Sequence, residues 1–203
     1  MSDTAGTGGA RRLLHTREVV CQGWVREDGL FDFEARLRDI SADGTDLYFK
    51  QVDAGGLLHG LRLTMTIDAD MQIVHMQAHS DTVPTPWCSE SSKPYDQLVG
   101  LRIGPGFTQL MKERVGGRKG CTHLTELIGP LATTAVQTVM ALRRETRDMA
   151  AELQGSDPMP RPMVYDTCHT YRAQGQAIQV IWPEHRRTGE TPPPGVGGAP
   201  RVA

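Results

Sequence analysis

The chain has few aromatic side chains and no long apolar run. Phe, Trp and Tyr make up 5% of its 203 residues, so the core must be built mainly from aliphatic side chains and Met. No stretch approaches the roughly 18 consecutive apolar residues that a membrane-spanning helix needs. The first twelve residues, MSDTAGTGGARR, contain no apolar segment of the kind that a signal peptide requires. We therefore expect a cytoplasmic protein without a membrane partner.

A basic excess is also absent. The formal net charge is −2, with 38% hydrophobic and 23% charged residues, which is typical of a globular protein. Proteins that bind nucleic acids without sequence preference usually have a strong excess of basic residues. We therefore expect no nucleic-acid partner. The four cysteines are Cys21, Cys88, Cys121 and Cys168. In the cytoplasm they are expected to be reduced thiols, metal ligands or nucleophiles rather than disulfides.

The first half of the chain has the pattern of β-strands. Apolar and charged side chains alternate over residues 31–38, and apolar and polar ones alternate over 61–67. Glu27-Asp28-Gly29 is typical of a hairpin turn. These features predict an antiparallel sheet, built largely as a meander, within residues 13–79. The Gly- and Asp-rich segment 41–60 is expected to form a long loop.

The second half has helical spacing over residues 89–99, 107–115 and 122–153, and a short strand is expected at 177–182. Strands followed by helices predict an α+β fold, in which a small antiparallel sheet packs against C-terminal helices. We expect a single domain over residues 13–186. The Gly-, Ala- and Pro-rich ends, 1–12 and 187–203, are expected to be disordered.

The sequence GCTH at 120–123 places a thiol and an imidazole at the expected start of the long helix. Free N–H groups and the helix dipole lower the pKa of a cysteine at this position, and Thr122 is a suitable N-cap. Cys121 and His123 are therefore candidates for a nucleophile or a metal ligand. The alternative is plain packing, because free cysteine is often buried. The spacing matches neither a CxxC nor an HExxH motif.

Other candidates lie in the predicted sheet and its loops. His79 lies on a strand beside other polar residues, and His59 follows a Gly-Gly pair. Each is either a pocket residue or an ordinary solvent-facing side chain. Trp24, Trp87 and Tyr171 are candidates for the wall of an apolar substrate pocket, or for ordinary packing.

Six blocks of the sequence carry a family resemblance. They are LHTREV at 14–19, REDGLFDFEARLRD at 26–39, LRLTMTID at 61–68, LVGLRIGPGF at 98–107, GCTHLTELIGPLATTAVQT at 120–138 and YDTCH at 165–169. With these blocks the chain resembles the bacterial family called domain of unknown function 2889, over about residues 13–186. This resemblance implies a role in the breakdown of aromatic compounds, including lignin-derived ones.

The order of strands, cysteine loop and long helix is also similar to the scaffold proteins of iron–sulfur cluster assembly. The resemblance implies a metal site formed by His59, Cys88 and Cys121. The scaffolds supply Cys and Asp where this chain has Leu57, Leu58 and His59. Because of this difference the chain does not match a site with four thiolate ligands. A mixed His and Cys set suits Zn²⁺, so the expected cofactor is zinc or none.

These observations favour an enzyme that acts on a small aromatic substrate. We expect a lyase in which a base removes a proton, a carbon–carbon or carbon–oxygen bond breaks, and formaldehyde is released. The candidate bases are His59, His79, His123 and Glu126, with Thr122 at a helix N-terminus that binds an oxyanion. The candidate substrate-binding residues are Trp87, Trp24, Tyr171 and His169.

Two other hypotheses remain open. One is a non-catalytic zinc or iron–sulfur carrier that uses the same residues. The other is a ligand-binding or interaction module in which the cysteines are inert. A homodimer is also compatible with the sequence.

Overall fold

The computed structural model describes residues 9–145 and 147–188. The chain divides into two compact units, residues 1–139 and 140–203, which are described separately below. Most of the two ends that were expected to be disordered lies outside the described residues. The expectation of a single domain over residues 13–186 stays a prediction.

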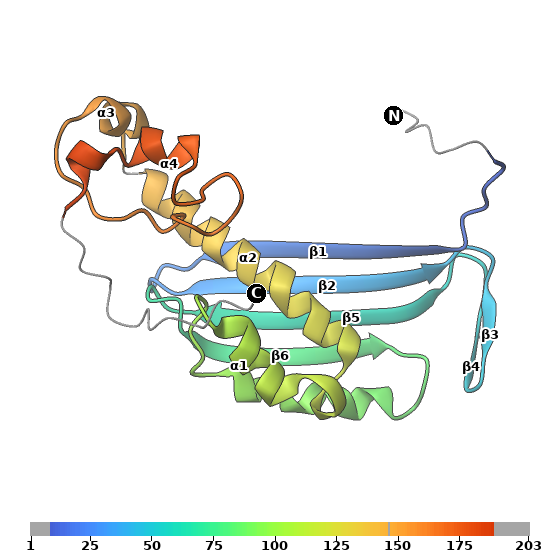
Figure 1. Cartoon of the computed structure of the whole chain (residues 1–203). Coiled ribbons are helices and arrows are strands. Elements are labelled where there is room, and N and C mark those ends of the chain that lie inside the picture. The colour runs from blue at the N-terminus through green and yellow to red at the C-terminus, as the bar shows by residue number, and fades with distance from the viewer. Residues whose placement is uncertain (1–8, 146, 189–203) are drawn as a thin grey trace. The chain divides into compact units, whose positions relative to one another are not determined.

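The first unit is built on a four-stranded antiparallel sheet in the order β1-β2-β5-β6 (Figure 1). Its strands are β1 (His15–Val25), β2 (Phe31–Ser41), β5 (Leu57–Ile67) and β6 (Ile73–Thr82). Each strand pairs with the next one in this order, so the predicted meander is confirmed. The strands are long for a sheet of this size, and three of them contain eleven residues.

The side-chain alternation decides which face of the sheet is buried. Phe33 and Leu37 of β2 are almost fully buried, whereas Arg36 and Arg38, which flank Leu37, are exposed. The helix α2 (Thr122–Glu145) crosses the buried face (Figure 1). The apolar stripe that α2 buries comprises Leu124, Leu127, Ile128, Leu131, Ala132, Ala135 and Val139.

A glycine lets α2 approach β1 closely. A Cβ atom at Gly23 would lie 2.5 Å from Oγ1 of Thr138 and 2.6 Å from the ring of Phe33. A larger side chain at this position would have to displace a core aromatic ring or the helix. The absence of a side chain at position 23 therefore sets how closely helix and sheet pack.

The remaining elements of the first unit are short. The segment 41–60, expected to be a loop, contains the hairpin β3 (Thr45–Leu47) and β4 (Lys50–Val52) as well as the start of β5. Two further helices precede α2, namely the 3₁₀-helix η1 (Cys88–Leu98) and α1 (Phe107–Val115). A one-turn 3₁₀-helix, η2 (Gly117–Lys119), joins α1 to α2.

The second unit contains α3 (Met149–Gln154), α4 (Gln176–Ile181) and η3 (Glu184–Arg186). The prediction of a final strand at 177–182 is wrong, because residues 177–181 belong to α4 and Trp182 is its C-cap. The N–H of Trp182 donates to the carbonyl of Ile178, and both side chains are buried on one helical face. A short apolar run does not by itself distinguish a strand from a helix.

The predicted α+β class is confirmed by this arrangement. The long helix expected over 122–153 ends at Glu145 and is followed by the separate helix α3. The helix expected at 89–99 is a 3₁₀-helix that contains Pro94, which lacks the N–H that an α-helical hydrogen bond needs. No helix within the described residues is long and apolar enough to cross a membrane.

Candidate functional site

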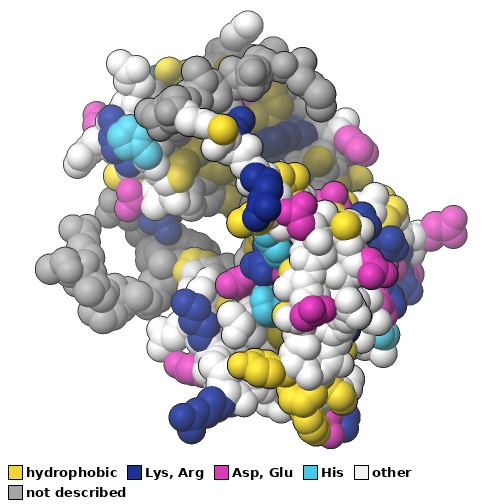
Figure 2. Space-filling model, turned by 90° about the vertical axis from the view of Figure 1, so that its right-hand side faces the viewer, with side chains coloured by type: hydrophobic (Ala, Val, Ile, Leu, Met, Phe, Trp, Pro, Cys, Tyr) yellow, Lys and Arg dark blue, Asp and Glu magenta, His cyan; other side chains and the backbone are white. Residues whose placement is uncertain are grey.

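A pocket of about 410 Å³ lies where β5 begins, where β6 leads into η1, and where α2 starts. Six residues singled out in the sequence line it. They are His59, Trp87, Cys88, Cys121, Thr122 and His123. Figure 2 shows histidine side chains gathered beside acidic and basic ones on this side of the molecule. Segments far apart in the sequence are therefore brought together here, as expected, and the chemical role of each residue stays a prediction.

A buried carboxylate, Asp39, is hydrogen-bonded to the pocket residue His59 and is only 1% exposed. It lies in one cross-strand row, with Arg17 of β1 on one side and His59 of β5 on the other. Arg17 donates from Nε to Oδ1 at 2.7 Å and from Nη2 to Oδ2 at 2.8 Å. Nδ1 of His59 lies 3.0 Å from Oδ2, and Nε2 of His15 lies 3.2 Å from Oδ1. Both oxygens of the buried carboxylate are thus satisfied.

Sequence reasoning missed Asp39, although the alternation contains a signal. Phe31, Phe33, Ala35 and Leu37 occupy the buried positions of β2, and the next buried position in the series is Asp39. A carboxylate at a position where the pattern calls for an apolar side chain indicates a buried, paired charge. The basic partners come from other strands, so the local pattern does not identify them.

The electrostatic environment keeps Asp39 ionised. Burial alone raises the pKa of this carboxyl group. The hydrogen bonds and positive charge of Arg17, together with the hydrogen bond to His15, outweigh burial and lower the pKa to about 2. Asp39 therefore carries a full negative charge at neutral pH.

His59 has the opposite preference. Burial and the nearby charge of His123 lower the pKa of His59, and the attraction of Asp39 opposes them only in part. An ionised carboxylate accepts hydrogen bonds and donates none, so Nδ1 of His59 carries the proton that Asp39 accepts. Nε2 of the neutral ring then has a free lone pair. No group in the described part of the chain donates a hydrogen bond to it.

His123 packs directly against His59. The two ring centroids are 4.1 Å apart, with an angle of 38° between the planes. Sγ of Cys121 lies 3.9 Å from Nδ1 of His123. The start of α2 thus places a thiol and a second imidazole beside the Asp39–His59 pair.

Tyr95 of η1 holds the N-terminus of α2 in place and was also missed in the sequence. Its hydroxyl donates to the carbonyl of Cys121 at 2.8 Å and accepts from the Cys121 N–H at 3.2 Å. Oγ1 of Thr125 lies 2.8 Å away. Tyr95 is fully buried, and burial raises its pKa to about 12, so it acts as a fixed neutral anchor. The N-cap was expected at Thr122. The helix begins at Thr122, so the N-cap is the preceding residue, Cys121, whose carbonyl accepts from the Thr125 N–H.

One hydroxyl in the pocket lacks a partner. Oγ of Ser80 is buried and forms no hydrogen bond within the described residues. Ser80 lines the same pocket as His59 and His123. A buried polar atom of this kind is usually satisfied by a water molecule or a ligand.

Within the described residues, one group of side chains has the spacing of a metal site. The ligand atoms of Asp39, His59 and His123 all lie within 4.8 Å of one another. This trio shares His59 with the metal site expected from the sequence. Cys88 and Cys121 line the pocket but do not belong to the trio, and Sγ of Cys88 lies 3.1 Å from Oγ1 of Thr85.

Glu126 lies one turn along α2 and is exposed. It accepts a hydrogen bond of 2.9 Å from Nη1 of Arg17, which also binds Asp39. The guanidinium group therefore connects the helix to the buried carboxylate.

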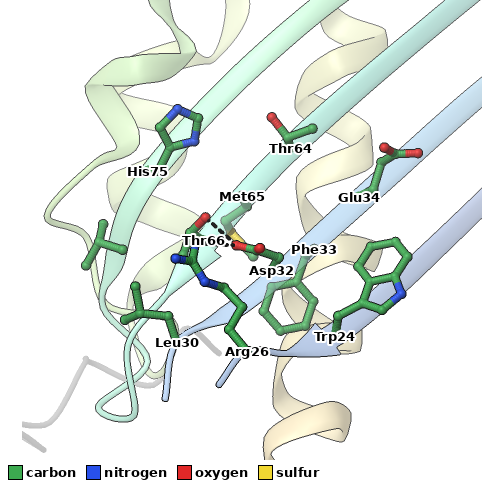
Figure 3. A pocket seen from close by; sticks show the side chains of 11 residues that line it. Trp24, Arg26, Leu30, Asp32, Phe33, Glu34, Thr64, Met65, Thr66 and His75 are labelled. Atoms are coloured by element: carbon green, nitrogen blue, oxygen red, sulfur yellow. Dashed lines mark hydrogen bonds and ion pairs between the residues drawn. The ribbon is translucent and has the colours of Figure 1, made fainter. Parts of the chain in front are cut away.

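Trp24 and His79 lie outside the pocket. Both lie on the opposite face of the sheet, paired with Asp32 and Arg62 respectively. Trp24 borders a broad, open depression on that face, which also includes His75 (Figure 3). Tyr171 and His169 belong to the second unit, where Tyr171 borders a separate pocket lined by apolar and basic side chains.

The family described as "Protein of unknown function (DUF2889)" matches residues 15–137. The chain belongs to this family. The matched region includes the whole sheet and the start of α2, and therefore every residue of the Asp39 network. No curated protein and no solved structure matches the chain, and the resemblance to iron–sulfur scaffolds is not confirmed.

The pKa of Asp39 predicts how stability depends on pH. This group has a pKa of about 2 in the folded chain and about 3.9 when unfolded. Its ionisation therefore stabilises the fold above pH ~4, and this contribution is lost as the pH falls towards 2. Urea unfolding at pH 4 and pH 2 measures the change. Between these pH values the free energy of unfolding of the wild type should fall by on the order of 2 kcal/mol more than that of Asp39→Asn. Equal losses in both proteins would show that Asp39 is not held ionised by its neighbours.

Proposed function

We propose that the protein is a cytoplasmic enzyme of bacterial aromatic-compound breakdown. In this proposal it is a lyase that acts on a small, lignin-derived phenolic substrate by acid–base chemistry and releases formaldehyde. The observation that carries the proposal is the Asp39–His59 pair at the pocket. Asp39 binds Nδ1–H of a neutral imidazole, which leaves Nε2 as a general base. A base with a pKa below the usual value for histidine is free of its proton at neutral pH.

The reaction that suits this base is an elimination through a quinone methide. The phenolate electrons expel a leaving group from the benzylic carbon. Nε2 of His59 then removes the O–H proton of a neighbouring hydroxymethyl group, whose C–O bond becomes the carbonyl of formaldehyde. The carbon–carbon bond breaks, its electron pair forms the alkene, and the ring regains its aromatic phenolate. The proton held on His59 passes to the departed leaving group, which balances the reaction.

Other pocket residues have roles in this scheme. In this scheme His123, whose ring packs against His59, passes the proton to the leaving group. Thr122 and the N-terminus of α2 stabilise the phenolate oxygen, because the helix dipole favours negative charge there. Trp87 offers an exposed aromatic surface to the substrate ring, and the unpartnered hydroxyl of Ser80 binds a polar group of the substrate. Roles for Glu126, His79, Trp24, Tyr171 and His169 remain predictions.

The proposal is tested with lignin-derived phenolic dimers that carry a hydroxymethyl group. The wild type should release formaldehyde and the matching alkene in equal amounts. His59→Gln should lower kcat by at least about 100-fold, because a general base contributes this much or more. His75→Gln is the matched control, since His75 lies exposed on the other face of the sheet. The proposal fails if the wild type releases no formaldehyde, or if His59→Gln retains full turnover.

A second candidate function is a non-catalytic zinc or iron–sulfur carrier. The spacing of Asp39, His59 and His123 favours it, because zinc accepts imidazole and carboxylate ligands. The full hydrogen bonding of Asp39 by Arg17 argues against it, since a metal would have to displace these bonds. For a carrier, elemental analysis of freshly purified protein should find about one bound metal ion per chain, which His123→Gln should remove. Less than about a tenth of an equivalent in the wild type would exclude the carrier.

A further inference from the structure

The strand β1 forms one edge of the sheet and is unpaired on its outer side. It contains eleven residues and pairs only with β2 among the described strands. Proteins usually protect such an edge with proline, lysine, a bulge or a short strand. β1 has no proline and no lysine, and its pairing with β2 shows no register shift. A long regular edge of this kind is a template for another strand.

The same strand exposes four large apolar side chains. Val19, Val20, Trp24 and Val25 are 43%, 52%, 47% and 53% exposed. Val19 and Val25 pair with buried residues of β2 and lie on the face that carries α2. Val20 and Trp24 lie on the other face. Apolar side chains on both faces of an unpaired edge strand indicate that a partner covers the edge and that it is not exposed to solvent.

We propose that β1 pairs antiparallel with β1 of a second copy of this chain. The two-fold axis passes through Gln22 and is perpendicular to the sheet, and the two sheets join into one of eight strands. In a two-fold dimer the same patch must complement itself. A perpendicular axis also keeps both α2 helices on the same face of the joined sheet. Each odd-numbered residue of β1 must therefore face an odd-numbered residue of the second copy, and each even-numbered residue an even-numbered one.

The sequence of β1 fits one such register. With Gln22 opposite itself, Val20 faces Trp24 of the second copy on one face of the sheet. On the other face, Val19 faces Val25 of the second copy. Each exposed apolar side chain thus meets another one, and acidic Glu18 faces basic Arg26 at both ends of the pairing.

The neighbouring registers lose this match. An axis through Cys21 places Trp24 opposite Glu18. An axis through Gly23 places Val20 opposite Arg26. Either shift sets apolar side chains against charged ones, so the complementarity is specific to the register centred on Gln22 and favours a second copy over an unrelated strand.

Crosslinking tests the register directly. In Gln22→Cys the two new thiols face each other across the axis, at a separation that suits a disulfide. Mild oxidation with diamide should give a covalent dimer, and mass spectrometry of the peptides should show that the disulfide joins the two introduced thiols. Gln77→Cys is the matched control, because Gln77 lies in the same cross-strand row on the opposite edge strand, β6. It should form no more dimer than the wild type.

Light scattering during size-exclusion chromatography tests the interface without a crosslink. The full chain should have twice the chain mass. The double variant Val20→Lys/Trp24→Lys should raise the dimer dissociation constant by about a hundredfold or more, because each substitution removes buried apolar area twice. Val74→Lys, an exposed valine on β6, should remain dimeric. A wild-type monomer overturns the proposal. Equal crosslinking of the Gln22 and Gln77 variants, or a dimer that survives the double variant, also overturns it.

Discussion

The hydrogen-bonded row formed by Arg17, Asp39 and His59 is the interaction on which the rest of the site depends. A carboxylate at the end of a buried series of side chains is tolerated only because Arg17 binds both of its oxygens. The same carboxylate then fixes the orientation and tautomer of His59. One buried charge thus links three strands and sets the chemistry of the pocket.

Two further contacts connect this row to the helix. Arg17 reaches Glu126 on α2, and His123 in the first turn of α2 packs against His59. Tyr95 fixes that turn through the backbone of Cys121. The pocket is therefore formed by rigid elements, which is the arrangement expected where groups must be held in a defined geometry. Because β1 supplies Arg17, an interface along its outer edge would also stabilise the strand that supports the site.

The sequence predicted those features of the fold and site that follow from local patterns. Alternation identified the sheet and its buried face, and the GCTH sequence correctly located the start of the long helix at the pocket. The short run at 177–182 was assigned to the wrong class of element, because a mostly apolar run of six residues has no decisive period. Asp39 and Tyr95 were missed because their roles depend on partners that are distant in the sequence.

The central claim is that His59 is neutral and that its hydrogen bond to Asp39 keeps the proton on Nδ1. Nitrogen-15 NMR of histidine side chains measures this directly, and His59→Gln assigns the signals by their loss. At neutral pH the account predicts a protonated Nδ1 and an unprotonated Nε2 for His59. A proton on Nε2, or on both nitrogens, would contradict the account, because His59 would then have no lone pair to accept a proton from the substrate.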